Sequence, residues 1–518
     1  MASSSVDTSL QLPHVPIVHE VDMVVIGSGV SGLSTAWHYL QASPVPQTVK
    51  VLSAKEAQGG WVQSASQTEG FLLEKGPHTL LGHHPILQSL LPALKLKPIM
   101  ASKASKKRFI VLEETLCPAP SVALNAMGGL LGWGAWVWKQ LWMPPHPEVA
   151  QETQHWSVAE WGRQRFSQRF VDTLLTPLCS GIYAGNPEQL GFQDTFKALH
   201  TLECEGQGSL LKGWLKKQYQ SCNPSKQTPC ETPHTKKKVP YHIISFPKGL
   251  GELSEALATS IDTQSPAWLQ STPKANATLV AWDDTQQQWH ITDATGTQWQ
   301  TPQLVMACQL QSWETLLAPL LESTQVWGAY REVVDHTPYS SLAMVQLGIA
   351  KEACRHPLQG FGALVSHRTT GTPQAKTHAQ SRSPVRLLGS LWPSSMFPNR
   401  SPEDHHLLIN FYGGAIDPDS LTWEDDALIT DCLHALHHLG ILKSPTPDKS
   451  FLKLVQVQRA IDAIPQSTLG HRDRVSTLKT ALNEAFKGRL HVVGSWSHGI
   501  SVTDCLAAGK QLAQTLTP

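Results

Sequence analysis

Three glycines near the N-terminus have the spacing of a phosphate-binding turn. Residues 24–32 have the sequence Val-Val-Ile-Gly-Ser-Gly-Val-Ser-Gly, so Gly27-x-Gly29-x-x-Gly32 follows an apolar run. In a dinucleotide site the first glycine makes a tight turn, the second lets the backbone approach the pyrophosphate, and the third lets a helix pack on the strand. The free N–H groups of that helix then face the anion. The pattern predicts a cofactor pyrophosphate here; a tight strand–helix turn without a ligand is the alternative.

A strand, a helix and a second strand must position this turn. The apolar run predicts the first strand, residues 33–40 predict the helix, and residues 48–52 predict the second strand. Together they complete a βαβ unit of about 30 residues. The second strand of such a unit often ends in Asp or Glu, which binds the ribose hydroxyls. Ser53 occupies that place and the nearest acid is Glu56, so a neutral and shorter side chain would meet the ribose.

Two further glycine-containing turns follow the second strand. Gly59-Gly60-Trp61 is one, and residues 70–78, ending in Glu74-Lys75-Gly76-Pro77-His78, contain the other. Two such turns around a short strand would bring backbone amides to a bound ligand. An ordinary β-hairpin is the alternative.

The overall composition favours a large apolar site. A chain of 518 residues exceeds one ordinary core, so two or three packed regions are expected. Its 41 basic and 41 acidic side chains balance, which gives no electrostatic footprint for nucleic acid. Only 16% of residues are charged and 18 are tryptophan. Both values favour an apolar pocket, a membrane-facing surface, or both.

Neither disulfides, a metal site nor a secretory signal is predicted. The nine cysteines are scattered, odd in number and never spaced as C-x-x-C, which favours a reducing compartment. Adjacent histidines such as His83 and His84 diverge and lack zinc-type spacing. Residues 1–20 lack the basic and apolar regions of a signal peptide. We therefore expect a disordered lead-in and a protein that is not secreted.

Residues 121–138 contain no charged side chain. Their length is at the lower limit for a membrane-spanning helix, and four glycines weaken that interpretation. Met127, Leu131, Trp138 and Trp142 fall near one helical face, and tryptophan favours the membrane–water boundary. Three alternatives stay open: interfacial membrane attachment, a buried core helix and a true span.

Similar pieces stand at the two ends of the chain. Residues 490–494 predict another buried strand, and a glycine-containing turn at 499–505 leads into a helix that ends near Leu516. Both ends are therefore predicted to build one nucleotide-binding domain, with the middle of the chain inserted into it. Polar stretches at 216–238 and 367–384 predict surface loops.

Taken together, these segments resemble the oxygen-dependent protoporphyrinogen oxidases, FAD-containing members of the flavin amine oxidase superfamily. The likeness extends over about residues 21–516, outside the two polar stretches. Cys179-Ser-Gly-Ile-Tyr-Ala-Gly185 looks like a signature segment of that family. The other stretches that carry the resemblance are Gly59-Gly60-Trp61, Glu74-x-Gly76-Pro77, and residues 246–250, 360–364, 391–400, 463–466 and 499–505.

The chain departs from the family pattern at three places. Ser53 replaces the usual acid, Ala307-Cys308-Gln309 stands where a Thr-x-Pro-like turn is common, and Gly494-Ser495-Trp496 differs from the frequent Gly-Gly-Asn. All three lie near the ends of the flavin in such proteins, so they bear on the tightness of FAD binding more than on the fold.

The resemblance implies a set of site residues. Arg108 matches an arginine that pairs with a substrate propionate, Leu364 and Phe397 match residues that sandwich the macrocycle, and Gly185 matches a glycine that lines the site. The alternatives are a solvated basic cluster for Arg108, core packing for Leu364 and Phe397, and a plain turn for Gly185. The residues predicted to bind FAD are Gly27, Ser28, Gly29, Val30, Ser31, Gly32, Ser53, Ala54, Gly59, Gly60, Trp61, Gly76, Pro77, His78, Thr79, Val280, Gly494, Gly499, Ile500, Ser501 and Val502.

The resemblance also implies the reaction. A bound FAD would remove six hydrogens from protoporphyrinogen IX, giving protoporphyrin IX, with O2 as acceptor and H2O2 as product. Coproporphyrinogen III as substrate is one alternative, and a non-catalytic flavin- or porphyrin-binding relative is another. The implied partners are the porphyrinogen and O2, a membrane surface contacted peripherally from the cytoplasmic side, a second copy in a homodimer, and a chelatase that receives the product.

The predicted fold is α/β: a discontinuous doubly wound FAD-binding domain, a mixed-sheet substrate domain and an inserted helical, membrane-associated segment. The expected division of the chain is a lead-in at 1–20, FAD-binding parts at 21–90, 241–315 and 456–518, a helical substrate-access segment at 91–205, a surface loop at 206–240, and the substrate domain at 316–455.

Overall fold

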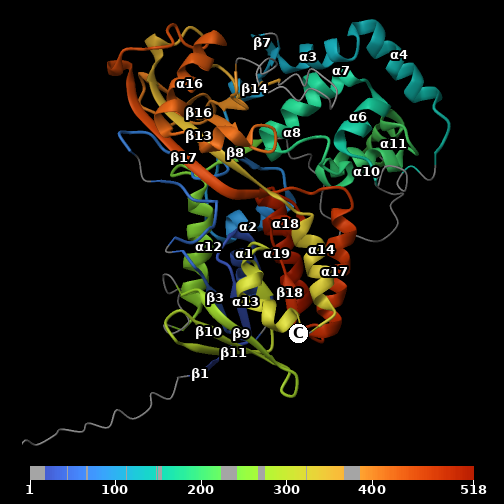
Figure 1. The fold of residues 1–518 in the computed structure, drawn as a ribbon, viewed down its shortest axis with the longest axis vertical. Coiled ribbons are helices and arrows are strands. Elements are labelled where there is room, and N and C mark those ends of the chain that lie inside the picture. Colours follow the sequence, from blue (N-terminus) through green and yellow to red (C-terminus); the bar gives the residue numbers. More distant parts are fainter. Residues whose placement is uncertain are drawn as a thin grey trace, which may run out of the picture.

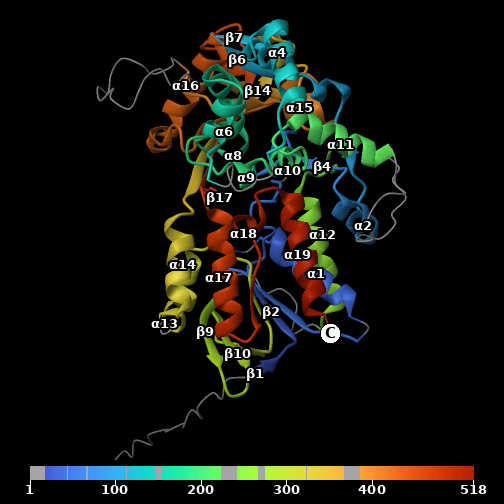
Figure 2. The ribbon, with the colours of Figure 1, turned by 90° about the vertical axis from the view of Figure 1, so that its right-hand side faces the viewer.

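The computed structural model describes residues 18–222, 242–366 and 385–517, apart from residues 44, 56, 66–67, 113, 147–148, 150–154, 267–274 and 323. The described chain forms two bodies stacked along the longest axis (Figure 1). The lower body holds the first and last elements of the chain, and the upper body holds a large sheet flanked by helices. Figure 2 shows the same division after a quarter turn.

A four-stranded parallel sheet forms the centre of the lower body. Its strand order is β18-β12-β2-β3, so strands from both ends of the chain lie in one sheet, as predicted. All four strands are short and, apart from Lys50 and His491, apolar, and alternate side chains enter different cores: Val25 packs on one face and Val24 on the other. The bounds are β2 Met23–Ile26, β3 Val49–Leu52, β12 Leu304–Met306 and β18 Leu490–Val492.

Different layers cover the two faces of this sheet. Helices cover one face, where α1 packs along α19 and α12. A second sheet, ordered β1-β11-β10-β9, covers the other face together with three helices, so this side is not purely helical as in an ideal doubly wound fold. The helices of the first face are α1 Val30–Ala42, α2 Pro85–Ala93, α12 Gly251–Gln264 and α19 Val502–Leu516. The other face has β1 Val18–Glu20, β9 Ala277–Asp283, β10 Gln288–Asp293, β11 Gln298–Thr301, α13 Ser312–Leu321, α14 Val326–Asp335 and α17 His471–Ala485.

A seven-stranded mixed sheet forms the upper body. Its order is β17-β13-β16-β15-β14-β6-β7, and only the β14–β6 pair is parallel among the described strands. Helix α16 covers one face of this sheet through a core that includes Leu428 and Leu436. The bounds are β6 Arg108–Leu112, β7 Thr115–Pro118, β13 Tyr339–Ala350, β14 Gly362–Val365, β15 Gly389–Leu391, α15 Pro393–Met396, β16 His405–Gly413, α16 Asp425–His438 and β17 Leu452–Pro465.

Short helices pack beside this sheet, and a small antiparallel sheet, β4-β8-β5, lies under them. The helices are α3 Ala119–Ala126, α4 Gly129–Trp142, α6 Val158–Arg165, α7 Gln168–Phe170, α8 Thr176–Tyr183, α9 Phe192–Thr195, α10 Lys197–Glu205 and α11 Leu210–Cys222. The small strands are β4 Leu80–Leu81, β5 Ile99–Met100 and β8 Ile243–Ser245, and α18 spans Ser495–His498 in the lower body. A π-helical turn, Val171–Leu175, joins α7 to α8, and 3-10 turns occur at Lys103–Lys106, Lys351–Ala353, Pro418–Thr422 and Lys449–Phe451.

Several expected boundaries differ from the observed elements. Within the predicted lead-in, residues 18–20 form β1, because they pair with β11, while residues 1–17 lie outside the described residues. The predicted loop at 206–240 is helical over α11, and 223–240 lie outside the described residues, as do 367–384. The segment 91–205 is not wholly helical, since β6 and β7 extend the large sheet.

The two later domain boundaries also shift. Helices α13 and α14 bury Leu317 and Tyr330 in the core below the parallel sheet, so the lower body continues past 315 to Asp335. Strand β17 pairs with β13 up to Pro465, so the upper body continues past 455. A buried apolar face sets the first boundary and strand pairing sets the second, and the local sequence predicts neither.

The apolar segment at 121–138 folds into α3 and α4. Among the described residues no helix combines the length and apolarity that crossing a bilayer requires. The buried-core alternative is wrong for α4, because six of its large apolar side chains are exposed. These are Leu130, Leu131, Trp133, Trp138, Leu141 and Trp142.

Candidate functional site

A cavity of about 770 Å³ lies where the two bodies meet. Its lower wall is the glycine turn at the carboxyl end of β2, the position at which open α/β sheets bind ligands. Its upper wall comes from β13, β16 and β17 of the large sheet. The volume is within the range of ligand and cofactor sites.

The first glycine turn has the geometry that the sequence predicts. Gly27 has φ +118°, and a Cβ there would lie 2.6 Å from the carbonyl oxygen of Ala307. A Cβ on Gly32 would lie 2.1 Å from the carbonyl oxygen of Gly27, so α1 can pack on β2 only with glycine at this position. A Cβ on Gly29 would meet no atom within 4 Å, and Gly29 has no side chain to cap the first N–H groups of α1. The fold therefore explains Gly27 and Gly32, whereas the space at Gly29 suits a ligand.

Ser28 of the glycine turn and Ser53 at the end of β3 meet at the predicted ribose position. The hydroxyls of Ser28 and Ser53 lie 2.7 Å apart, and the Ser53 hydroxyl donates to the carbonyl oxygen of Lys55 at 3.0 Å. Both serines line the cavity. The Ser53 hydroxyl is thus already hydrogen-bonded within the protein. It offers the ribose hydroxyls weaker hydrogen bonding than a free Asp or Glu carboxylate would.

Glu74 supports the second turn from inside the protein. One carboxylate oxygen accepts from the N–H of Leu250 at 2.9 Å, and the other accepts from the hydroxyl of Ser64 at 2.5 Å. Burial raises the pKa of this carboxyl to about 7, against the opposing effects of both hydrogen bonds and of Arg400. Glu74 does not line the cavity, so it joins the turn at 59–78 to the start of α12.

Two buried ring nitrogens on the cavity wall lack a protein partner. His78 Nε2 and Trp496 Nε1 have no hydrogen bond to any residue that the structure describes. Burial, assisted by the charge of Arg400, lowers the pKa of His78 to about 3, so its ring is neutral. The ring meets Phe411 edge-to-face, with centroids 6.5 Å apart. Buried polar atoms are normally paired, so both nitrogens are candidates for bonding a ligand.

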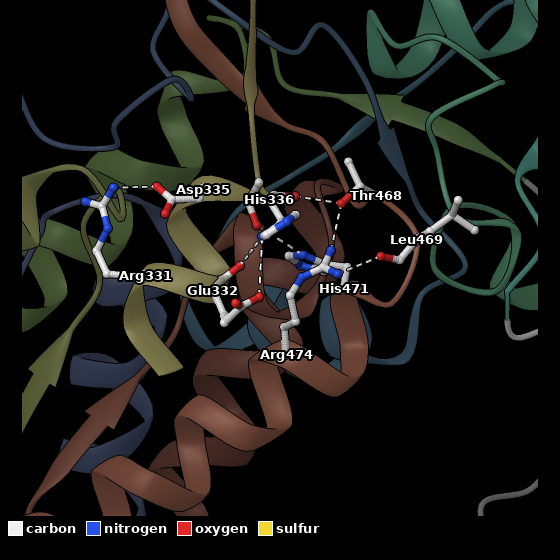
Figure 3. A network of polar contacts seen from close by, with 9 residues as sticks. Arg331, Glu332, Asp335, His336, Thr468, Leu469, His471 and Arg474 are labelled. Carbon is white, nitrogen blue, oxygen red and sulfur yellow. Dashed lines mark hydrogen bonds and ion pairs between the residues drawn. The ribbon is translucent and has the colours of Figure 1, made fainter. Parts of the chain in front are cut away.

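His471 connects this wall to two of the segments where the chain crosses between the bodies. Figure 3 shows the seam between α14 and α17, where the Thr468 hydroxyl donates to the carbonyl of His336 at 2.6 Å and Arg474 donates to Thr468 at 2.7 Å. The buried His471 ring places Nε2 2.6 Å from the carbonyl oxygen of Trp496 and Nδ1 3.2 Å from the Thr337 hydroxyl. Nε2 must therefore carry the proton. This contact fixes the backbone of Trp496 at the cavity.

The upper wall is largely apolar. Met344 on β13 lies directly opposite Phe411 on β16, and both line the cavity with Ile461 and Ile464 of β17. Sequence reasoning missed these residues, because each belongs to an ordinary alternating strand with no motif around it. They create a chamber beside the glycine turns that suits a second, apolar ligand.

No activated nucleophile is found among the described residues of the cavity wall. Burial raises the pKa of Cys308 to about 12 and that of Cys505 to about 11, so both lining thiols stay protonated. The described lining contains no carboxylate, but it includes Lys55, Lys75 and Arg459. The site can bind anionic groups and an apolar body, and it must take its redox chemistry from a cofactor.

Most of the predicted cofactor residues line the cavity, and five do not. Val280 is buried in β9 between the two lower sheets, where it pairs with Ile291, and its role as a cofactor residue stays a prediction. Gly32 packs behind the turn, and Thr79, Gly499 and Ser501 stand next to lining residues. The predicted residues on the wall are Gly27, Ser28, Gly29, Val30, Ser31, Ser53, Ala54, Gly59, Gly60, Trp61, Gly76, Pro77, His78, Gly494, Ile500 and Val502.

The four predicted substrate residues lie outside the described wall of this cavity. Leu364 is one layer behind it, where a Cβ on the lining residue Gly181 would meet the Leu364 side chain at 2.2 Å. A Cβ on Gly185 would meet Gln466, so this glycine serves packing. Phe397 is buried in a small cluster with Phe361, and the exposed Arg108 guanidinium lies over the same Phe361 ring at 5.2 Å.

The fold and the site define a dinucleotide-cofactor protein with an apolar ligand chamber facing the cofactor turns. Residues 30–517 match the family described as flavin containing amine oxidoreductase. The chain belongs to this family and is an FAD-dependent oxidoreductase. The residues present fit the cofactor: the uncapped turn at Gly29 would hold the pyrophosphate, the serine pair would meet the ribose, and the two unpartnered ring nitrogens offer hydrogen bonds.

Named relatives share nearly the full length of the chain. It is 28% identical over 510 residues to protoporphyrinogen oxidase 1, chloroplastic, of Arabidopsis thaliana, covering 95% of this chain and 87% of that protein. It is 22% identical to coproporphyrinogen III oxidase of Bacillus subtilis, covering 94% and 96%. A crystal structure from Exiguobacterium sp. 255-15, named as a candidate protoporphyrinogen oxidase, superimposes with a TM-score of 0.70 at 21% identity, covering 96% and 98%. The last comparison confirms the α/β fold with its mixed sheets.

Proposed function

We propose that this enzyme oxidises protoporphyrinogen IX to protoporphyrin IX with O2 as acceptor. The balance is three O2 consumed and three H2O2 formed for the six hydrogens removed. The proposal rests on the named relatives and on one observation: a single cavity joins the glycine turns to the apolar wall around Met344 and Phe411. An apolar macrocycle suits the space between that wall and the cofactor turns, where both of its faces would be buried.

The charge of the site supports a substrate that carries carboxylates. The described lining contains Lys55, Lys75 and Arg459 but no Asp or Glu, and the Lys55 ammonium lies over the Trp61 ring at 5.2 Å. Arg459 is already paired with Asp425, whereas the Lys75 ammonium donates to the neutral Gln63 amide at 3.1 Å. Lys75 is therefore the better placed cation for a propionate.

In this proposal the protein binds the substrate and excludes water from the site, while the flavin carries the redox step. Bound FAD supplies a hydride acceptor and returns the electrons to O2. The walls from β13, β16 and β17 hold the macrocycle and exclude water. The neutral His78 ring can hydrogen-bond without adding charge, and the protonated Cys308 and Cys505 thiols avoid side reactions.

Arg108 remains our candidate for a propionate partner near the entrance. Its side chain is exposed and has no ion-pair partner within the described chain. Contact with the Phe361 ring orients the guanidinium, whose planar fork suits a carboxylate. Phe397, in the same cluster, would then support the binding surface from behind.

Anaerobic mixing of the FAD-loaded protein with protoporphyrinogen IX tests the function. We expect bleaching of the flavin absorbance and, on admission of air, porphyrin fluorescence above the autoxidation blank with three H2O2 per porphyrin. Faster flavin reduction by coproporphyrinogen III would reassign the substrate, as the Bacillus subtilis relative makes plausible. Failure of both compounds to reduce the bound flavin would favour a non-catalytic relative.

We also propose peripheral attachment to a membrane through α4 and α11. The two helices pack together, and the exposed apolar side chains of α4 continue onto Trp214, Leu215 and Tyr219 of α11. Exposed Lys139, Lys216 and Lys217 border them. An apolar face with lysines beside it is typical of interfacial helices. This location would admit a lipophilic substrate and allow delivery of the product to a chelatase.

Vesicle flotation tests the attachment. Changing Trp138 and Trp142 to Gln should release the protein from vesicles that contain anionic lipid. Leu279→Gln, which removes an apolar side chain exposed to 59% on β9 of the lower body, is the matched control and should still bind. Unchanged flotation of the double variant would refute this surface.

A further inference from the structure

A second cavity, of about 470 Å³, lies in the lower body between α17, β18 and α19. Figure 2 shows these helices beside α18, at the edge of the molecule's parallel sheet. Leu482, Leu490 and Leu512 form an apolar floor. None of the residues that line this cavity lines the cofactor cavity, so the two spaces are separate.

A half-buried lysine stands at one end of the apolar floor. The Lys479 ammonium donates to Nε2 of His498 at 3.1 Å, so this imidazole is a neutral acceptor. The described lining contains no Asp or Glu, and Lys479 forms no ion pair with any residue that the structure describes. Burial lowers the pKa of Lys479, which is the expected result of a cation held away from water without a counter-ion.

The groups around Lys479 are neutral or positive, and Asp504 lies near Lys197 rather than in the lining. Lys197 donates to the carbonyl oxygen of His498 at 2.8 Å, from the side of α10. Burial, Lys479 and Lys197 together lower the pKa of His498 to about 4. His491, also in the lining, contacts Gln303 at 2.8 Å, and burial lowers its pKa to about 4 as well. Both imidazoles are neutral near pH 7, so the lysine charge stays unbalanced.

We propose that this cavity binds a small monocarboxylate with a short apolar chain, the carboxylate meeting Lys479 and the chain covering the leucine floor. A carboxylate would complete the lysine with a charge-assisted hydrogen bond. Leu482 and Leu490 are already buried, so an unbranched chain lying on this floor would itself be removed from water. Asn483 and Gln511 in the lining supply further N–H donors for the carboxylate.

Isothermal titration of the FAD-loaded protein with hexanoate tests the proposal. We expect one site, binding that strengthens from acetate to hexanoate by up to about fourfold per CH2 group, and little heat from inorganic phosphate. Lys479→Met should weaken hexanoate binding about 10- to 100-fold, while Lys479→Arg, which keeps the charge, should retain most of it. Lys449→Met, at an exposed lysine of the upper body, is the matched control and should bind as the parent does.

Three results would overturn the proposal. One is the absence of hexanoate binding to the folded, yellow parent protein. Another is hexanoate binding that Lys479→Met does not weaken, which would place the ligand elsewhere. The third is phosphate binding tighter than hexanoate, which would indicate an inorganic anion site in which the apolar floor has no part.

Discussion

Replacing Gly29 with alanine separates the demands of the fold from those of the cofactor. Gly29 has φ −68° and ψ 169°, an extended conformation that alanine adopts freely, and an added Cβ would meet no atom within 4 Å. At Gly32, by contrast, the Cβ would lie 2.1 Å from the carbonyl oxygen of Gly27. If the first turn binds the pyrophosphate, Gly29→Ala should damage FAD binding alone, and Gly32→Ala should damage the fold.

The expected magnitudes differ for the two properties. Gly29→Ala creates no clash, so the stability of the apoprotein should change by no more than about 0.5 kcal/mol. The methyl group would stand in front of the uncapped N–H groups of α1 and prevent close approach of the phosphate. Loss of one hydrogen bond to a charged group costs about 1.5–3 kcal/mol, which corresponds to FAD affinity about 10- to 150-fold weaker.

Two measurements on apoprotein test this reasoning. Quenching of FAD fluorescence on titration gives the affinity, and thermal unfolding without FAD gives the stability. Gly328→Ala is the matched control, because a Cβ on Gly328 of α14 also meets no atom within 4 Å and the residue lies away from the cavity. Parental FAD affinity in Gly29→Ala would refute the assignment of this turn to the pyrophosphate. A fall in apoprotein stability would show that Gly29 serves the fold instead.

Three further changes address the ribose position, a buried acid and the substrate entrance. Ser53→Glu should strengthen FAD binding about tenfold, because a carboxylate would accept from the ribose hydroxyls; unchanged or weaker binding in the same titration contradicts this. The pKa of Glu74 is raised from 4.5 to about 7. The protonated carboxyl therefore adds fully to the free energy of unfolding below pH 4.5, and this contribution is lost as pH rises towards 7. Relative to Glu74→Gln, the parent should therefore lose about 3 kcal/mol over this interval, and parallel unfolding curves against pH for the two proteins would contradict the shift. Arg108→Ala should raise KM for protoporphyrinogen about tenfold with unchanged flavin content. A loss of flavin would place Arg108 in the cofactor site.

The cofactor turns could be predicted because their constraints are local. Gly27 is required by its φ of +118° and Gly32 by its contact with Gly27, and such demands, set within a few residues, leave a fixed spacing in the sequence. Val280 could not be placed in this way. Its strand has the alternation of many others, and only the pairing with β10 shows that it faces a core.

The substrate side is different, because long-range register builds it. Met344 and Phe411 are far apart in sequence and become neighbours only when β13 pairs with β16. Neither residue carries a motif, and apolar residues in strands usually predict core. Arg108 and Phe397 show the converse: matching a family segment identified them, yet the structure places both beside Phe361, outside the cavity wall.

Both bodies contribute to one cavity, so the geometry of the site depends on how the chain crosses between them. Two of the crossings, after α14 and before α17, are bonded to each other through Thr468 and His336. His471 then extends this link to the backbone of Trp496 on the cavity wall. Because the same few hydrogen bonds hold the crossings and the wall, movement of the upper body would displace groups that face the cofactor. We therefore expect the apolar chamber and the cofactor turns to respond together when either is perturbed.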